Sequence, residues 1–266
     1  MRFTDIVSKI VKNKIPCYFI SPHFDDAVFS AGGLISFLSK RTTVVMINIF
    51  TKGYRPSTFS GKKYLYQCGY TNVEKLFDDR RKEDMVVNGK LGVKVINLDF
   101  IDAQWRKKEK TNVFEKFLGK IISEPLHIYP TYKLHIIRGI VAKNDVKLVK
   151  AITDKLLFLI GNKKNFKVFC PLAVGKHIDH IIVRDICCRL FKNIVYWADF
   201  PYSQKCDIDK EFVKVNNLKS YNFSINFSKK SGLILGYRSQ VRAVFPEGIQ
   251  KLPSETYYLL SEQCGK

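Results

Sequence analysis

The segment FISPHFDDAVFSAGG, residues 19–33, places three side chains that can bind a metal or transfer protons between an apolar run and a run rich in alanine and glycine. They are His23, Asp25 and Asp26. A strand that ends before His23 would fix the imidazole, and a helix that begins at Asp26 would return that carboxylate to the same point. We expect the small residues of this helix to leave room for a ligand. Paired aspartates are also typical helix N-caps, but a cap does not account for the histidine.

A second polar cluster, GKHIDH at residues 175–180, contains two of the five histidines of the chain. If a helix begins at residue 178, the spacing of His177 and His180 puts both on one face beside Asp179. An H-x-x-H pair alone is often incidental on a helix surface. Together, however, the two clusters could close one site, because His23, Asp26 and one of these histidines give three ligands. Three protein ligands leave a fourth position for water, as in a catalytic zinc site.

Both clusters follow predicted strands of a parallel sheet. We expect strands at residues 17–20, 43–50, 94–98, 166–170 and 193–199. We expect helices at residues 26–39, 73–91, 145–160 and 181–191, and loops at residues 52–71, 125–138 and 202–222. This alternation predicts an α/β fold with a Rossmann-like, mostly parallel sheet flanked by helices. Open sheets of this kind bind ligands at the carboxyl ends of their strands, and we expect the metal site there.

The length and composition favour a soluble globular protein with a full hydrophobic core. The chain has 266 residues, of which 46% are hydrophobic, and it lacks repeats and linkers. We therefore expect one domain over residues 1–266. Apolar runs are too short for a membrane span and a signal peptide pattern is lacking, so we expect a cytoplasmic protein. Seven cysteines without a C-x-x-C pair argue against a disulfide framework or a structural zinc finger.

The net charge of +21 is spread along the chain, including the basic run at residues 106–110. A solvated lysine-rich surface explains this distribution, and a surface that attracts a phosphate-bearing or otherwise anionic substrate is the main alternative. We do not expect nucleic-acid binding as the main function, because the sequence lacks a long basic run and an aromatic-basic repeat. The oligomeric state stays open, with a homo-oligomer among the options.

The two polar clusters carry a family resemblance. PHFDDAVFSAGG and GKHIDH resemble the P/A-H-P-D-D-E and H-P-D-H motifs of the PIG-L, or LmbE-like, zinc-dependent N-deacetylases. RRKEDMVVNGKLGV resembles the R-x-x-E helix of that family, LDFID the next strand and its Asp, and KSGLILGYRSQ the C-terminal K-x-x-A-x-x-x-H/Y-x-S-Q helix. The resemblance extends from about residue 15 to about residue 244. It departs at Phe24, where proline is usual, and at Ala27, where glutamate is usual.

This resemblance implies one Zn²⁺ per chain and a set of metal ligands: His23, Asp26 and His180. It implies that Asp25 is the general base, that His177 is the general acid or the oxyanion partner, and that Asp179 orients His177. Zinc chemistry suits amide hydrolysis, because the ion lowers the pKa of water and polarises a carbonyl. An ordinary carboxylate is ionised at neutral pH and suits the role of base.

The resemblance further implies that Arg80, in R-x-x-E, contacts sugar hydroxyls, and that Asp102 does the same. The alternative for Arg80 is an ion pair on a helix surface with Glu83 or Asp84. The tyrosines of the predicted loops could stack on sugar rings or could simply pack: Tyr54, Tyr64, Tyr66, Tyr129, Tyr132 and Tyr202.

The implied function is a zinc-dependent hydrolase that removes the acetyl group from an N-acetylated amino sugar. The substrate class would be an N-acetylglucosaminyl moiety of a glycoconjugate, a cofactor or a natural-product precursor. The alternative is a catalytically inactive sugar- or phosphate-binding protein on the same fold, suggested by Phe24 and Ala27. The retained base and acid argue against this alternative.

Overall fold

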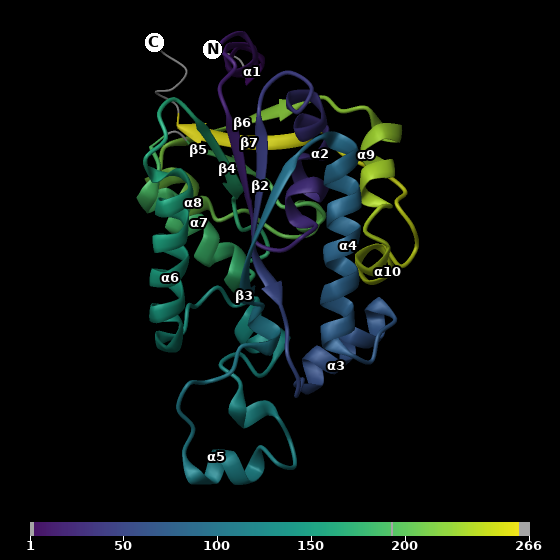
Figure 1. The fold of residues 1–266 in the computed structure, drawn as a ribbon, viewed down its shortest axis with the longest axis vertical. Coiled ribbons are helices and arrows are strands. Elements are labelled where there is room, and N and C mark those ends of the chain that lie inside the picture. The colour runs from purple at the N-terminus through teal and green to yellow at the C-terminus, as the bar shows by residue number, and fades with distance from the viewer. Residues whose placement is uncertain (1–2, 193, 261–266) are drawn as a thin grey trace.

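A seven-stranded sheet forms the centre of the computed structural model, which describes residues 3–192 and 194–260 (Figure 1). The strand order is β3-β2-β1-β4-β5-β7-β6. The first five of these run parallel, whereas β7 pairs antiparallel with both β5 and β6. The strands are β1 Cys17–Ser21, β2 Val44–Lys52, β3 Lys94–Ile101, β4 Lys167–Pro171, β5 Ile194–Trp197, β6 Leu218–Phe223 and β7 Glu255–Leu260. The predicted α/β class with a mostly parallel, Rossmann-like sheet is confirmed.

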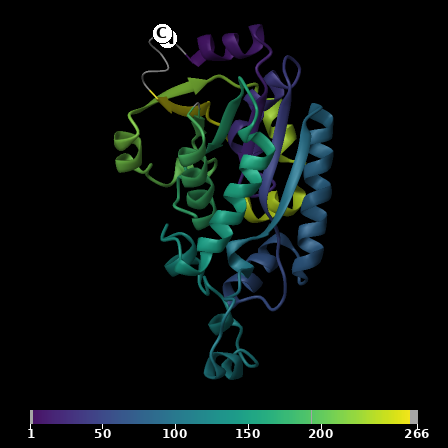
Figure 2. The same ribbon diagram turned by 60° about the vertical axis from the view of Figure 1, so that its left-hand side comes forward.

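Helices cover both faces of this sheet, as Figures 1 and 2 show. The helices of one layer share a core that includes residues of α1, α2, α4 and α9, whereas the core on the other face includes residues of α6 and α7. The α-helices are α1 Phe3–Lys12, α2 Asp26–Leu38, α3 Phe59–Cys68, α4 Val73–Leu91, α5 Val113–Leu118, α6 Val146–Leu156, α7 Ile178–Leu190, α8 Lys210–Val215, α9 Phe227–Ile234 and α10 Arg238–Val244.

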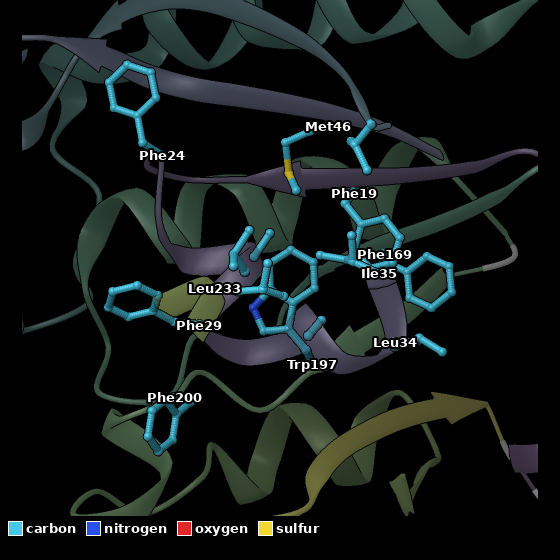
Figure 3. Packing of buried hydrophobic residues seen from close by; sticks show 14 of the residues in the cluster. Phe19, Phe24, Phe29, Leu34, Ile35, Met46, Phe169, Trp197, Phe200 and Leu233 are labelled. Atoms are coloured by element: carbon cyan, nitrogen blue, oxygen red, sulfur yellow. The ribbon is translucent and has the colours of Figure 1, made fainter. Parts of the chain in front are cut away.

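The central strands are apolar along most of their length because helices cover both of their faces. All five residues of β1 are buried, and the Phe19 ring stacks on Phe169 of β4 with centroids 4.4 Å apart. Trp197 of β5 lies beside them, as Figure 3 shows. This core anchors the strand ends from which the polar clusters emerge.

The predicted elements differ from the observed ones mainly at their ends and in the loops. The predicted helix over residues 145–160 ends at Leu156 and continues as a π-helical turn, Leu157–Gly161. The strand predicted over residues 193–199 ends at Trp197, and its first residue lies outside the described residues. Two segments predicted as loops contain regular structure. Residues 52–71 include α3, and residues 202–222 include α8 and most of β6.

The alanine and glycine run in α2 serves packing rather than a ligand. Helical geometry breaks at Ala31, and the Glu255 carboxylate from β7 accepts hydrogen bonds from the N–H groups of Gly33 and Leu34. A Cβ at Gly33 would lie only 3.0 Å from a carboxylate oxygen of Glu255. The Lys230 ammonium, 2.8 Å from the same carboxylate, completes a buried ion pair. The expectation that these small residues leave room for a ligand was therefore wrong for Gly33.

Two sequence expectations concern properties of the whole chain. Among the described residues, none of the helices has the length and apolar character needed to cross a membrane. Four cysteines in the described ranges are buried, in agreement with a structural role: Cys17, Cys68, Cys170 and Cys187. All cysteines within those ranges are free thiols.

Candidate metal centre and active site

The two polar clusters meet where the strand order reverses. His23 and Asp26 follow β1, and His177 and His180 follow β4, which is the neighbour of β1 in the sheet. The helices after β1 and β4 lie on opposite faces, so their first residues flank a crevice at the carboxyl ends of these strands. The prediction that a site forms at this edge therefore rests on the topology as well as on the motifs.

All three predicted metal ligands converge on one point. Asp26 Oδ2 lies 3.0 Å from His23 Nδ1 and 3.3 Å from His180 Nε2. One ligand atom from each residue lies within 4.8 Å of the other two. Both imidazoles are buried, and the Asp26 side chain is slightly more accessible. Two nitrogens and one carboxylate oxygen form a donor set that suits Zn²⁺ with a fourth position left open.

The nitrogens of the two histidines that face away from this point also meet carboxylates. His23 Nε2 lies 3.2 Å from Asp179 and 3.3 Å from Asp102. His180 Nδ1 lies 2.7 Å from Asp199 Oδ1. A carboxylate there accepts the imidazole N–H and leaves the opposite nitrogen free as a ligand, which is the usual outer contact of metal-binding histidines.

The charge of the cluster also fits a divalent cation. When ionised, five carboxylates face only two buried guanidinium groups: Asp25, Asp26, Asp102, Asp179 and Asp199 against Arg80 and Arg106. Burial alone lowers the pKa of His23, yet Asp102 and Asp26 raise it to about 10. Asp26 and Asp199 likewise raise the pKa of His180 well above its usual value against the effect of burial. The cluster thus attracts positive charge, which a bound metal would supply in place of these protons.

A second group of potential ligands, His23, His177 and Asp179, also lies within 4.8 Å. It fits a metal less well, because the Asp179 carboxylate already accepts the Ala103 N–H at 2.9 Å and pairs with Arg106. The first group is therefore the better candidate.

Asp25 lies next to Asp26 in the chain and is held by a different partner. Its carboxylate pairs with the Arg80 guanidinium at 2.8 Å, and both side chains are buried. Asp25 occupies the N-cap position of α2 but makes no capping hydrogen bond with its side chain. The N-cap alternative therefore does not explain Asp25. Burial raises the pKa of Asp25, and the positive charge of Arg80 opposes this rise.

The alternative role of Arg80, a surface ion pair along α4, is wrong. Only 2% of Arg80 is exposed. The two acidic residues proposed as its partners are engaged elsewhere: Glu83 accepts from Ser239, and Asp84 accepts from Asn48, Asn88 and Tyr237. Arg80 Nε makes no hydrogen bond with the described residues. A contact with a sugar hydroxyl stays a prediction.

His177 caps α7 and keeps a defined tautomer. Its Nδ1 accepts the backbone N–H of Asp179 at 3.3 Å, so the proton of the neutral ring is on Nε2. The His177 ring centroid lies 5.2 Å from those of His23 and His180. Burial and the nearby His23 hold the pKa of His177 well below its usual value. The helix begins at Ile178, as the prediction required, and the short distance between the two rings places His177 beside His180.

Asp179 and Asp102 both contact His23, which was not the partner predicted for either of them. The hydrogen bonds of the Asp179 carboxylate join it to His23, to the Ala103 N–H and to Arg106, rather than to the His177 ring that it was expected to orient. Asp102 is buried, and its other oxygen accepts the Gln104 N–H at 2.9 Å. Its predicted contact with a sugar hydroxyl stays a prediction.

Sequence reasoning missed two residues of the site. Asp199 follows β5 by two residues and was taken as the end of a strand, although a charged residue directly after an apolar strand was a usable signal. Arg106 was grouped with a solvated basic run, whereas the structure buries it between Asp179 and Asp145. Nothing in the sequence distinguishes Arg106 from the lysines that follow it.

The two departures from the family motif pack into the core. Phe24 is fully buried, with the Arg80 guanidinium 5.7 Å and that of Arg81 5.5 Å from its ring centroid. Ala27 is fully buried, and its N–H donates to Ser21 Oγ. Neither substitution removes a group from the ligand cluster.

Two of the predicted loop tyrosines lie beside the histidines. The Tyr132 ring centroid is 6.3 Å from that of His177, and the Tyr202 centroid is 6.3 Å from that of His180. The others lie elsewhere or are engaged. Tyr64 donates to Gln240, Tyr129 donates to Asp145, and Tyr54 and Tyr66 are exposed.

The fold and the site together define an α/β protein with a buried His/Asp/His cluster at the switch point of a Rossmann-like sheet. The family model of PIG-L, described as GlcNAc-PI de-N-acetylase, matches residues 18–191. The chain belongs to the PIG-L family.

Its relatives are deacetylases. The chain is 25% identical over 246 residues to 2'-N-acetylparomamine deacetylase from Niallia circulans. The aligned region covers 86% of this chain and 82% of the relative. Among solved structures, a deacetylase of the teicoplanin biosynthesis pathway matches with a TM-score of 0.69 and 19% identity, covering 91% of this chain and 96% of that one. The zinc-inhibited form of a teicoplanin deacetylase matches with a TM-score of 0.68 and 19% identity, covering 91% and 97%. At these identities the structural matches support the fold.

Proposed function

We propose that this protein is a zinc-dependent hydrolase that removes the acetyl group from an N-acetylated amino sugar. The observation that carries the proposal is the convergence of His23 Nδ1, Asp26 Oδ2 and His180 Nε2, with Asp25 beside them and engaged by Arg80. The deacetylase relatives support the reaction, and the N-acetylated amino sugar in the name of the Niallia circulans relative supports the substrate class.

Zinc, when bound by these three ligands, would lower the pKa of a water and polarise the acyl carbonyl. The residues of the chain supply the proton transfers. Asp25 takes a proton from the attacking water as general base, and the Arg80 guanidinium favours the ionised carboxylate that this requires. Because burial raises the pKa of Asp25, the protonated carboxyl can then give the same proton to the leaving nitrogen as the C–N bond breaks.

His177 suits the role of oxyanion partner better than that of general acid. The Asp179 N–H occupies its Nδ1, which leaves Nε2–H as a donor from a neutral ring. Burial, which lowers the pKa of His177, keeps the ring neutral. A preorganised donor of this kind stabilises the negative charge that develops on the acyl oxygen.

The sugar would lie against the aromatic side chains at the mouth of the site. Tyr132 and Tyr202, which flank His177 and His180, could pack on the ring of an N-acetylglucosaminyl group. Arg80 Nε could donate to a hydroxyl. The class of conjugate, whether a glycoconjugate, a cofactor or a natural-product precursor, is proposed only at this level, and a phosphate-bearing substrate would suit the basic surface.

Asp25→Asn tests the proposal. Purified wild-type protein with zinc is assayed for acetate and new primary amine on a panel of N-acetylated amino sugars, free and phosphate-linked. Removing a general base costs at least about 100-fold in rate, so we expect Asp25→Asn to lose activity and keep its zinc. Asp78→Asn, an exposed change on α4, serves as the matched control.

Two outcomes would contradict the proposal. If Asp25→Asn kept full activity, another residue would be the base. If the zinc-loaded wild type bound a sugar of the panel but released no acetate from any member, the inactive sugar-binding alternative would be favoured.

A further inference from the structure

Residues 107–128 form a projection from the body of the protein that we call the α5 lobe. Two hydrogen bonds close its base: Lys108 N–H donates to the carbonyl of Leu126 at 2.9 Å, and Ile128 N–H donates to that of Arg106 at 2.9 Å. In Figures 1 and 2 the lobe extends beyond the end of the sheet toward which β2 points, which is the end that carries the His/Asp/His cluster. The base of the lobe adjoins this cluster, because Arg106, the residue before the lobe, pairs with Asp179.

The α5 lobe exposes large apolar side chains. Helix α5 has no buried residue. Val113 is 85% exposed, Phe114 68%, Phe117 62% and Ile121 74%, and Ile122 beside them is also exposed. Single apolar residues on a surface need no explanation, but such a cluster in one short segment is typical of a binding surface.

The charged residues of the lobe are mainly basic once their ion pairs are considered, and the remaining carboxylate, Glu124, accepts the Phe59 N–H at 2.5 Å. Glu115 pairs with Lys108 at 2.7 Å, and Glu109 pairs with Lys147 outside the lobe at 2.5 Å. The side chains of three lysines near these apolar residues make no hydrogen bond or ion pair with any described residue: Lys110, Lys116 and Lys120. The lobe therefore presents apolar side chains together with three lysines that have no side-chain partner among the described residues.

We propose that the α5 lobe docks on the surface of an anionic lipid bilayer. Phe114, Phe117 and Ile121 would enter the boundary between headgroups and acyl chains, and the three lysines would contact lipid phosphates and carboxylates. Apolar side chains bordered by lysine are the pattern of interfacial membrane segments. A self-associating surface would have to bring the unpaired lysines of two copies together, which the charge disfavours. The docking does not depend on the proposed deacetylase activity, although it would turn the candidate site toward the lipid.

Vesicle co-sedimentation of the full chain tests the proposal. One set of vesicles contains phosphatidylcholine alone, and the other contains phosphatidylcholine with phosphatidylserine. Each lysine at an anionic surface is worth roughly fivefold in affinity, so three predict binding about 100-fold stronger to the second set. The double variant Phe114→Glu with Phe117→Glu removes two inserted rings and adds negative charge, and we expect it to lose binding on the order of 100-fold.

Phe158→Glu is the matched control. Phe158 is 84% exposed in the turn that precedes β4, at the opposite end of the sheet, so this variant should bind anionic vesicles as the wild type does. Because α5 buries no side chain, the double variant should unfold at the wild-type temperature, and thermal unfolding verifies this. Failure of the wild type to bind anionic vesicles would overturn the proposal, as would undiminished binding by the folded double variant. A wild-type dimer that the double variant abolishes, without vesicle binding, would assign the surface to a second copy instead.

Discussion

Asp199→Asn should weaken metal binding at the candidate site from a distance. Asp199 contacts the nitrogen of His180 that faces away from the centre. Asp199 Oδ1 accepts from His180 Nδ1 at 2.7 Å, and Oδ2 accepts the Val174 N–H at 2.8 Å. An asparagine offers only one acceptor. If its oxygen stays with Val174, its NH₂ group faces His180 Nδ1, which must then be unprotonated. The proton moves to Nε2, the nitrogen that faces Asp26 and would bind the metal.

The expected loss follows from this change of tautomer. Outer carboxylates of metal-binding histidines typically contribute 10- to 100-fold to affinity. Because Asp199 is only 1% exposed, water cannot easily replace the lost acceptor. We therefore expect zinc affinity to fall by about 100-fold, or about 3 kcal/mol. Competition with a chromophoric zinc chelator at fixed pH measures this.

Asp185→Asn is the control for Asp199→Asn, because it changes a partly exposed carboxylate on α7, the helix that carries His180. It should bind zinc with wild-type affinity. If the asparagine at 199 instead turned its oxygen to His180, the Val174 N–H would face an NH₂ group, and the cost would appear as about 1–3 kcal/mol of stability. A folded Asp199→Asn variant with both wild-type zinc affinity and wild-type stability would refute the reasoning.

Three further predictions concern other buried charges. Lys230→Met strands the Glu255 carboxylate without its cation, so we expect thermal and denaturant unfolding to show a loss of about 3–5 kcal/mol, which a second change, Glu255→Gln, should partly restore. Burial raises the pKa of Asp84 to about 7, so its protonated form stabilises the fold below pH about 4, and this contribution is lost as the pH rises through about 7. Asp84→Asn removes the titration, and its unfolding free energy should diverge from that of the wild type by up to about 4 kcal/mol over this window, whereas parallel curves would contradict the assignment. Arg80→Gln removes the charge that opposes the rise in the pKa of Asp25, so the acid limb of the kcat/KM profile should move to higher pH, and an unmoved limb would show that Asp25 is not the titrating base.

The convergence of His23, Asp26 and His180 was predictable from the sequence because the motifs that contain them are short and contiguous. His23 and Asp26 lie three residues apart after one buried strand, and His180 follows another. Parallel strands place such ends at the same edge, so knowing the order of apolar strands and helices was enough to bring the two motifs together. That the chain forms one domain stays a prediction.

The residues around the cluster were less predictable because their role depends on packing. Asp199 lies outside any motif, and its partner His180 is fixed by tertiary structure. Arg106 looks in sequence like the exposed lysines beside it, and only the burial of Asp179 distinguishes it. The small residues of α2 were expected to leave room for a ligand, because the Glu255 carboxylate that Gly33 accommodates lies more than 200 residues away in the chain.

The last two strands were missed for a related reason. Strand β6 lies at the edge of the sheet, and most of its residues are exposed or only partly buried, so its sequence LKSYNF lacks an apolar run. Among the strands of the described ranges it pairs only with β7, which follows it by more than 30 residues, and its register is set by tertiary contacts rather than by local pattern.

Zinc stoichiometry by elemental analysis, after equilibration with zinc and removal of the excess, tests most directly whether His23, Asp26 and His180 form one metal centre. We expect about one zinc per chain in the wild type and in His135→Ala, which removes an imidazole that is hydrogen-bonded to Thr131 Oγ1 and belongs to neither group of potential ligands. We expect zinc to be lost in His180→Ala and in Asp26→Ala with the fold retained. Full zinc occupancy in both of these variants would contradict the shared site.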